Sequence, residues 1–277
     1  MSLLQAEAGA AAPRWSPVVA ERHGPDGMPV STLFPVAEEC PVTITYHGVA
    51  YAVMMATPAD LADYAVGFSL AEGIAQVAWH VLSSAVTAQD TGGMTLDIRL
   101  HPDSLRRFLA QRRVRNRVGH GGCGVCGVED FADALPMPHD IQPDPLTLSG
   151  ATIKRALAGL RQHQSLARLT HGAHAAAWVS TGGDILLARE DIGRHNAMDK
   201  LVGGVIRAGL PRRSGFAVIT SRASVEIVQK AVTAGFGALV AISAPSAMAV
   251  DWARRHGLTL IGSARDQGFA VFSGRVD

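Results

Sequence analysis

Cysteine is scarce in this chain, which has only three cysteines among 277 residues. So few thiols exclude a fold held together by a disulfide framework and suit a reducing compartment. A chain of this length removes about three quarters of its extended surface from water when it folds. Its core therefore needs neither disulfides nor a structural metal.

An excess of charge of one sign is also absent. The 25 Lys and Arg residues against 24 Asp and Glu residues leave a formal net charge of +1, which argues against general nucleic-acid binding and against a charged tail. Hydrophobic residues make up 48% and charged residues 18% of the chain, a composition that excludes intrinsic disorder.

Long apolar runs are missing as well. Residues 231–250 carry no charge, but Gly235, Gly237 and Pro245 interrupt them. We interpret this stretch as a helix end, a buried strand and a turn rather than as a membrane span. The first residues show neither a basic start nor a sustained apolar core, so we expect no secretory signal and a cytoplasmic protein.

The N-terminal part predicts a tail followed by a hairpin. Residues 1–28 lack periodicity and contain several Pro and Gly residues, so we expect a mobile tail. Val42, Ile44 and Tyr46 alternate with polar residues up to a turn at His47-Gly48. The alternation resumes at Val49, Tyr51 and Val53. This pattern predicts two strands with one buried face.

A helix and two further strands complete a small N-terminal domain. Thr57 is a suitable N-cap, Pro58 suits the first helical position, and Gly73 ends the apolar helical pattern. Two strands follow, the first over 81–88. We therefore predict a small α+β domain over residues 29–112.

Residues 113–148 are rich in Gly and Pro and predict a long loop. Loops of this length are uncommon inside a compact protein and are usually functional or mobile. This one contains the sequence GGCGVCG at 121–127, in which two residues separate Cys123 from Cys126.

From Ser149 onward the pattern is that of an α/β domain over 149–277. Strands that alternate with helices predict a sheet covered on both faces, which gives three α/β/α layers. In such sheets ligands bind beyond the carboxyl ends of strands. This places candidate binding loops at Ser221-Arg222, at 243–246 and at 262–268. The expected helices are 149–160, 194–207, 224–234 and 246–255, and the expected strands are 175–180, 185–188, 216–220, 238–243, 258–261 and 269–272.

The Cys-x-x-Cys pair admits several interpretations. Zinc would need further ligands, and no second close cysteine pair and no His-x-Glu motif are present. A thioredoxin-like pair would stand at a strand-to-helix junction rather than in a glycine-rich loop. A sulfur relay would use the exposure and freedom that glycine provides. Six arginines stand just upstream, where they either favour thiolates or form a solvated helix face: Arg106, Arg107, Arg112, Arg113, Arg115 and Arg117. We expect Cys40 to be a structural residue at a strand edge.

A second polar segment, TGGDILLAREDIGRHNAMDKLVG, occupies residues 181–203. In a structural interpretation, Asp191 caps the helix, and His195 and Asp199 form an exposed pair four residues apart. In a functional one, the helix N-terminus holds phosphates together with Arg194 and His195. His171 and His174 fit satisfied core or loop histidines better.

Four segments in this order resemble the formate dehydrogenase accessory sulfurtransferase family, FdhD. They are GGCGVCG (121–127), REDIGRHNAMDKLVG (189–203), SRASVEIVQKAVTAG (221–235) and ISAPSAMAV (242–250). The N-terminal sequence from Glu39 to Ile74 is also similar to that family, and the resemblance spans about residues 29–274.

The resemblance implies a sulfur carrier in which Cys123 bears a persulfide and Cys126 relays or releases the sulfur. The sulfur donor would be a cysteine desulfurase. The acceptor would be molybdenum cofactor in its bis(molybdopterin guanine dinucleotide) form, destined for a formate dehydrogenase apoenzyme. The C-terminal domain would be cytidine-deaminase-like without protein-ligated zinc, and the protein a homodimer with no nucleic-acid or membrane partner.

The resemblance also implies binding residues. The guanine-binding segment corresponds to Ser263, Ala264, Arg265, Asp266, Gln267 and Gly268. It lacks the aromatic start and the second basic residue that are usual in the family. We expect the cofactor phosphates to contact main-chain donors and some of Arg194, His195, Arg222 and Arg265. The alternative function is a cofactor chaperone for formate dehydrogenase in which the cysteines only sense redox state.

Overall fold

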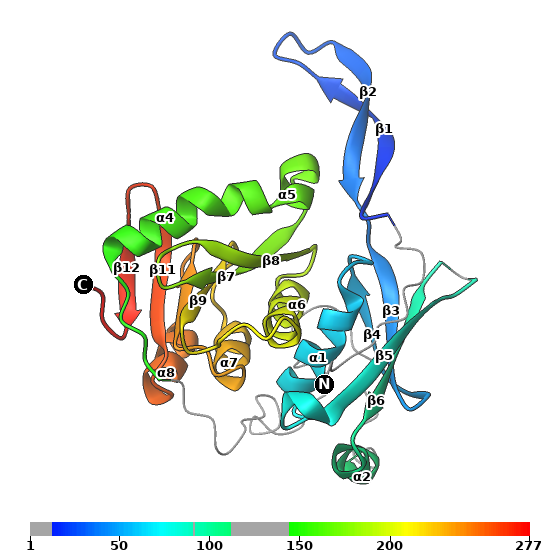
Figure 1. Cartoon of the computed structure of the whole chain (residues 1–277). Coiled ribbons are helices and arrows are strands. Elements are labelled where there is room, and N and C mark those ends of the chain that lie inside the picture. The colour runs from blue at the N-terminus through cyan, green and yellow to red at the C-terminus, as the bar shows by residue number, and fades with distance from the viewer. Residues whose placement is uncertain (1–12, 91, 112–143) are drawn as a thin grey trace.

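The structure is a computed structural model that describes residues 13–90, 92–111 and 144–277. Figure 1 shows two sheets packed around a layer of helices, with a two-stranded hairpin that projects from this body. The predicted Cys-x-x-Cys loop lies outside the described residues except for its end at 144–148. Among the described helices, none is long and apolar enough to cross a bilayer.

The larger sheet has six strands in the order β12-β11-β10-β9-β7-β8. Its centre, β9 to β11, is parallel, whereas β7, β8 and β12 each run antiparallel to a neighbour. Parallel strands buried on both faces read as continuous apolar runs, as they do here. The strands are β7 (His174–Ser180), β8 (Ile185–Asp191), β9 (Gly215–Ile219), β10 (Ala238–Ala241), β11 (Thr259–Arg265) and β12 (Gly268–Ser273).

Helices cover both faces of this sheet, so the predicted three-layer α/β/α arrangement is confirmed. On one face Ile153 and Leu160 of α4 pack with Val218 of β9, and on the other Leu201 of α6 packs with Trp178 of β7. Ser149 accepts a hydrogen bond from the N–H of Thr152 and caps α4, as expected. The helices of this unit are α4 (Gly150–Leu160), η3 (Arg161–His163), α5 (Ser165–Thr170), α6 (Arg194–Arg207), α7 (Val225–Thr233) and α8 (Ala247–Arg255).

The smaller sheet has the order β4-β3-β6-β5. The predicted hairpin is confirmed, because Tyr46 pairs with Val49 across a two-residue turn in which His47 and Gly48 both have positive φ. The predicted alternation after the turn is wrong at Val53, whose side chain is exposed. A register shift at Tyr51 inverts the faces from there on, so Ala52 and the following even-numbered residues point into the core. The strands are β3 (Cys40–Tyr46), β4 (Val49–Ala56), β5 (Val81–Ala88) and β6 (Met94–Leu100).

Helix α1 (Leu61–Ala71) begins later than predicted. Its N-cap is Asp60, not Thr57, and the side chain of Asp60 makes no capping hydrogen bond. Thr57 is buried and its hydrogen-bonding groups serve a polar network described below, which leaves it unable to cap the helix. Two short elements complete this unit, η1 (Ala78–His80) and α2 (Pro102–Gln111).

Helices α1 and α6 lie in direct backbone contact and join the two sheets. A Cβ atom at Gly67 would lie 1.8 Å from the carbonyl oxygen of Asp199, and one at Gly203 would lie 1.8 Å from that of Asp63. Only glycine allows this approach. One hydrophobic cluster therefore runs from the smaller sheet through α1 and α6 to the larger sheet.

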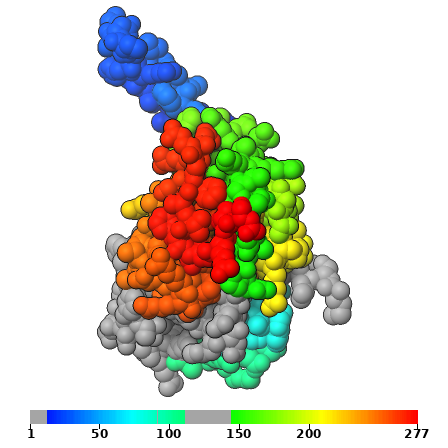
Figure 2. All heavy atoms as spheres, turned by 90° about the vertical axis from the view of Figure 1, so that its left-hand side faces the viewer, coloured from blue at the N-terminus to red at the C-terminus, as the bar shows by residue number. Residues whose placement is uncertain are grey.

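The prediction of an irregular tail before residue 28 is wrong for the described residues. β1 (Trp15–His23) and β2 (Pro29–Ala37) form an antiparallel ribbon paired along its whole length, with a turn in which Gly27 donates to Gly24. Figures 1 and 2 show this ribbon standing away from the body. We call residues 13–37 the arm. Its several prolines and its exposed apolar residues hide the alternation that would have predicted strands.

Candidate functional site

The three loops predicted to bind a ligand meet at one edge of the larger sheet. The N–H of Ser263, near the end of β11, donates to the carbonyl of Ser243 after β10 over 3.1 Å. Ser246 donates in turn to the carbonyl of Ala223 after β9 over 3.0 Å. Parallel strands end at a common edge, and these hydrogen bonds tie the loops that follow them together.

Helices α6 and α7 both begin at this edge. β8 ends at Asp191, opposite His174 at the start of β7, and β7 runs antiparallel to β9 with Ala176 opposite Ile219. The end of β8 and the end of β9 therefore lie on the same side of the sheet, and a helix follows each. Two helix N-termini therefore lie at the edge where the loops described above meet, and the first N–H groups of a helix have no partner within the helix itself.

Buried polar atoms without partners cluster at these helix starts. Nε2 of His195, Nε of Arg194 and Oγ of Ser224 are buried and have no hydrogen-bond partner among the described residues. His195 is only 7% exposed. Buried polar groups are nearly always hydrogen-bonded, so each such atom requires an explanation. A guanidinium, an imidazole and a hydroxyl beside helix N-termini form a set of groups suited to an anion such as a phosphate.

The imidazole of His195 is neutral at ordinary pH. Burial, and after it the positive charges of Lys230 and Arg194, lower the pKa of His195 from 6.5 to about 3. The pKa of His174 is also lowered, first by burial and then by Arg194. Both histidines thus face the positive field of Arg194 and can exchange hydrogen bonds without a charge of their own.

The expectation of an exposed pair of His195 and Asp199 is wrong, because both residues are buried. Asp199 pairs instead with Lys230 of α7, whose Nζ lies 2.6 Å and 2.7 Å from the two carboxylate oxygens. Burial raises the pKa of Asp199 to about 6 against the opposing charge of Lys230. This ion pair fixes α6 to α7 behind the helix starts.

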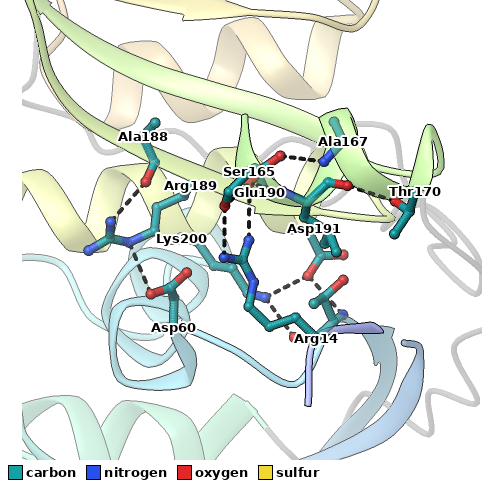
Figure 3. A network of polar contacts seen from close by, with 12 residues as sticks. Arg14, Asp60, Ser165, Ala167, Thr170, Ala188, Arg189, Glu190, Asp191 and Lys200 are labelled. Atoms are coloured by element: carbon teal, nitrogen blue, oxygen red, sulfur yellow. Dashed lines mark hydrogen bonds and ion pairs between the residues drawn. The ribbon is translucent and has the colours of Figure 1, made fainter. Parts of the chain in front are cut away.

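A second buried ion pair, between Asp191 and Lys200, holds the two sheets together (Figure 3). Oδ2 of Asp191 lies 2.6 Å from Nζ of Lys200 and accepts the N–H of Thr57. Oδ1 accepts from the N–H of Gly193 and from Asn196. Nζ of Lys200 also donates to the carbonyl of Thr57. Asp191 is therefore not the N-cap of α6, because Gly193 occupies that position. The carboxylate of Asp191 instead joins α6 to Thr57 after β4.

Charged neighbours of Asp191 anchor the arm and α1 (Figure 3). The carboxylate of Glu190 accepts from Arg14 at the base of the arm and from Ser165, and it accepts two N–H groups at the start of α5. Nη2 of Arg189 lies 2.6 Å from Asp63 of α1. Most charged side chains of residues 189–200 are thus paired with other groups of the fold. Arg194 and His195 remain as candidates for ligand binding.

The predicted guanine-binding segment is the tip of the hairpin between β11 and β12. Arg265 pairs with Gly268 across it, and Ser263 has a φ of 51°. Arg265, Asp266 and Gln267 are exposed at the tip. The side chain of Ala264 is buried in the core, so this residue could contact a ligand only through its main chain. Arg222, also predicted, is exposed beside the edge.

Cys123 and Cys126 lie outside the described residues, as do four of the six arginines before them. Arg106 and Arg107 are exposed on α2. Cys40 starts β3, packs against the core and has a pKa raised by burial, which fits the structural role expected for it.

One group within the described ranges has the composition of a metal site, namely His80, His101 and Asp103. Each histidine has a local structural role. Nδ1 of His101 accepts the N–H of Asp103 at the start of α2, and Nδ1 of His80 bonds with the hydroxyl of Ser104 at 2.8 Å. Arg106 pairs with Asp103 and competes for its carboxylate.

Sequence reasoning missed Ser224 and Lys230 as parts of this site. Ser224 carries a detectable signal, because a serine directly before a helix that follows a buried strand is a typical N-cap. Lys230 carries none, since only the packing of α7 against α6 brings its charge toward His195.

Comparisons with known proteins agree on one family. The model of the FdhD/NarQ family matches residues 37–276. A protein from Xanthomonas campestris pv. campestris (strain B100), named sulfur carrier protein FdhD, is 46% identical over 240 residues, which cover 86% of this chain and 83% of the relative. A protein of the same name from Bordetella petrii is 41% identical over 241 residues, which cover 86% of this chain and 84% of that one.

A solved structure shares the fold. The crystal structure of a proposed formate dehydrogenase accessory protein from Desulfotalea psychrophila superposes with a TM-score of 0.71 at 21% sequence identity. The likeness covers 95% of this chain and 98% of the other.

Proposed function

We propose, from the premise that this chain belongs to the FdhD/NarQ family, that it carries sulfur to molybdenum cofactor for a formate dehydrogenase. The strongest support is the identity with relatives named sulfur carrier protein FdhD. The family match spans residues 37–276 and so includes Cys123 and Cys126. The proposed donor is a cysteine desulfurase, and the proposed compartment is the cytoplasm.

The chemistry begins with the thiolate of Cys123. It attacks the outer sulfur of the desulfurase persulfide, the sulfur–sulfur bond of the donor breaks, and the desulfurase cysteine leaves as a thiolate. Cys123 then bears the persulfide. Cys126 either takes over the outer sulfur or attacks the inner one. The second route releases hydrosulfide and leaves a disulfide that a cellular thiol reduces.

The acceptor is the guanine dinucleotide form of the cofactor, which carries phosphates. The starts of α6 and α7 suit such a ligand, because Nε of Arg194, Nε2 of His195 and Oγ of Ser224 are buried there and lack partners among the described residues. We assign the guanine end to the hairpin tip at 263–268, with Arg265 as its cation and Arg222 as a further phosphate contact.

Mass spectrometry tests the sulfur step. The full chain, incubated with a cysteine desulfurase and cysteine, should gain one persulfide that is lost in Cys123→Ala and retained in the control Cys40→Ala. A persulfide that persists in the variant lacking both Cys123 and Cys126 would overturn the proposal. A Cys123→Ala protein that still yields active formate dehydrogenase would favour the cofactor chaperone instead.

Hydrogen exchange tests the assignment of the guanine end. Guanosine diphosphate, used as the probe, should protect the backbone of residues 263–268 and the start of α6. Protection confined to other segments would contradict the assignment without affecting the sulfur step.

A further inference from the structure

Two histidines and an aspartate meet at one end of the smaller sheet. His80 ends η1 directly before β5, and His101 directly follows β6. Val81 pairs with Leu100 across these antiparallel strands. The N–H of His101 also donates to the carbonyl of His80 over 2.8 Å. The backbone therefore fixes the two histidines opposite each other, and Asp103 follows in the first turn of α2.

The spacing of the three side chains suits a single metal ion. Nδ1 of His101 lies 3.4 Å from Oδ2 of Asp103, and two ligand atoms on one tetrahedral zinc ion are about 3.4 Å apart. The rings of His80 and His101 are nearly parallel, with centroids 5.1 Å apart. One ligand atom from each of the three residues lies within 4.8 Å of the others. Shifts of up to about 1.5 Å therefore bring all three around one ion, and the partly exposed side chains of His101 and Asp103 have room to rotate.

The hydrogen bond of His80 prepares its ring for a metal. Nδ1 of His80 bonds with the hydroxyl of Ser104 at 2.8 Å, and Ser104 is buried. This bond sets the orientation of the ring and leaves Nε2 for an ion. Histidines that bind metals typically hold their other nitrogen in such a hydrogen bond. Trp79 also packs edge-on against both rings, with centroids 4.2 Å from His80 and 5.0 Å from His101, and restricts their movement.

The contacts that compete with a metal at this place are weak. Arg106 pairs with Asp103 but is 76% exposed, and an exposed ion pair contributes little stability. The N–H of Asp103 donates to Nδ1 of His101 over 3.3 Å, which is long for a hydrogen bond. A divalent ion can therefore displace both contacts.

We propose that the chain binds a zinc ion through Nε2 of His80, Nδ1 of His101 and Oδ2 of Asp103, with water as the fourth ligand. Two imidazoles and one carboxylate are ligands that suit zinc, whereas Mg²⁺ and Ca²⁺ take oxygen ligands. The ion joins η1, β6 and α2 at the end of the smaller sheet, where Figure 1 shows α2. The site goes beyond the proposed function, because the cofactor is assigned to an edge of the larger sheet.

The test is calorimetric titration of the full chain with Zn²⁺. The thiols of Cys123 and Cys126 also have affinity for zinc, so the parent protein carries Cys123→Ser and Cys126→Ser. It should bind one equivalent of zinc, and a large excess of Mg²⁺ should not compete. His101→Ala and Asp103→Asn should each raise the dissociation constant at least about 100-fold. Ser104→Ala, which removes only the partner that orients His80, should raise it about 10-fold.

Matched controls exist elsewhere in the chain. His256 lies beside Trp252, with ring centroids 4.9 Å apart, and exposed Asp184 pairs with Arg155. His256→Ala and Asp184→Asn should therefore bind zinc as the parent does. Zinc should also raise the thermal unfolding midpoint of the parent by several degrees, but not that of His101→Ala, because the ion binds only the folded site.

Two results would overturn the proposal: less than one equivalent of zinc bound at saturation, or equal affinities of the His101→Ala and His256→Ala variants. Because the titrated chain lacks the cysteine pair, the result is independent of the sulfur chemistry.

Discussion

Asp191 and Lys200 form an ion pair in which neither side chain has any exposed surface, with 2.6 Å between Oδ2 and Nζ. The pair connects the end of β8, the middle of α6 and Thr57 after β4. The charged segment 189–200 thus has two roles. Asp191 and Lys200 hold the two sheets together, and Arg194 and His195 lie at the edge where the loops meet.

Removing the charge of Lys200 should destabilise the fold strongly. Lys200→Met leaves the carboxylate of Asp191 buried without its cation, which costs about 3–5 kcal/mol in comparable sites. Urea denaturation of the two proteins measures the difference. Lys154→Met, at an exposed position of α4, should change the free energy of unfolding by less than about 0.5 kcal/mol. Equal effects of the two substitutions would contradict the role of the pair.

The contact between α1 and α6 should not tolerate a single methyl group. A Cβ at Gly67 meets the backbone of Asp199 at 1.8 Å, so Gly67→Ala must push the helices apart. We expect a loss of more than about 3 kcal/mol or an unfolded protein. Gly159→Ala in α4 is the control, since its Cβ meets its nearest neighbour at 3.7 Å. This change should stabilise the helix by about 0.5–1 kcal/mol, and thermal unfolding compares both.

Acid should destabilise the protein partly through His195. Its folded-state pKa of about 3 lies below the ordinary 6.5, so between these values the unfolded chain binds a proton that the folded chain does not. The stability that depends on neutral His195 is complete above pH 6.5 and falls as the pH drops, by up to about 1.4 kcal/mol per unit. Asp199 acts in the opposite direction between 3.8 and about 6, because its pKa is raised in the folded state.

The comparison of wild type with His195→Gln isolates the histidine, since Asp199 is present in both. Between pH 6.5 and pH 4 the wild-type chain should lose about 2–3 kcal/mol more than the variant. Urea denaturation at several pH values measures it. Parallel curves for the two proteins would show that His195 does not titrate in this way.

Arg194 should contribute to nucleotide binding. If it contacts a phosphate, Arg194→Gln removes a charge-assisted hydrogen bond and should raise the dissociation constant for guanosine diphosphate about 10- to 100-fold. Isothermal titration calorimetry of the full chain measures this. Arg213→Gln, exposed before β9 rather than after it, should bind as the wild type does. Equal affinities of both variants would remove Arg194 from the site.

Local sequence patterns predicted most regular elements of the C-terminal unit. Helix α6 occupies the predicted 194–207, and Ser149 caps α4 as expected. The turn at His47-Gly48 was predictable because a two-residue hairpin turn needs positive φ, which both residues adopt. The arm escaped prediction, because its apolar residues face outward and its prolines resemble those of a tail.

The sequence by itself determined where most helices and strands of the C-terminal unit run and that the strand-end loops would gather at one edge. These properties follow from periodicity and capping, which act over a few residues. Only the tertiary structure decided which polar residues are free to bind. Thr57 binds both Asp191 and Lys200, and Lys230 binds Asp199, although these partners are distant in the chain. By contrast, Nε2 of His195 has no partner within the described part of the chain. The physical reason is that the pairing of buried charges depends on how elements pack, and that packing is set by contacts such as those of Gly67 and Gly203.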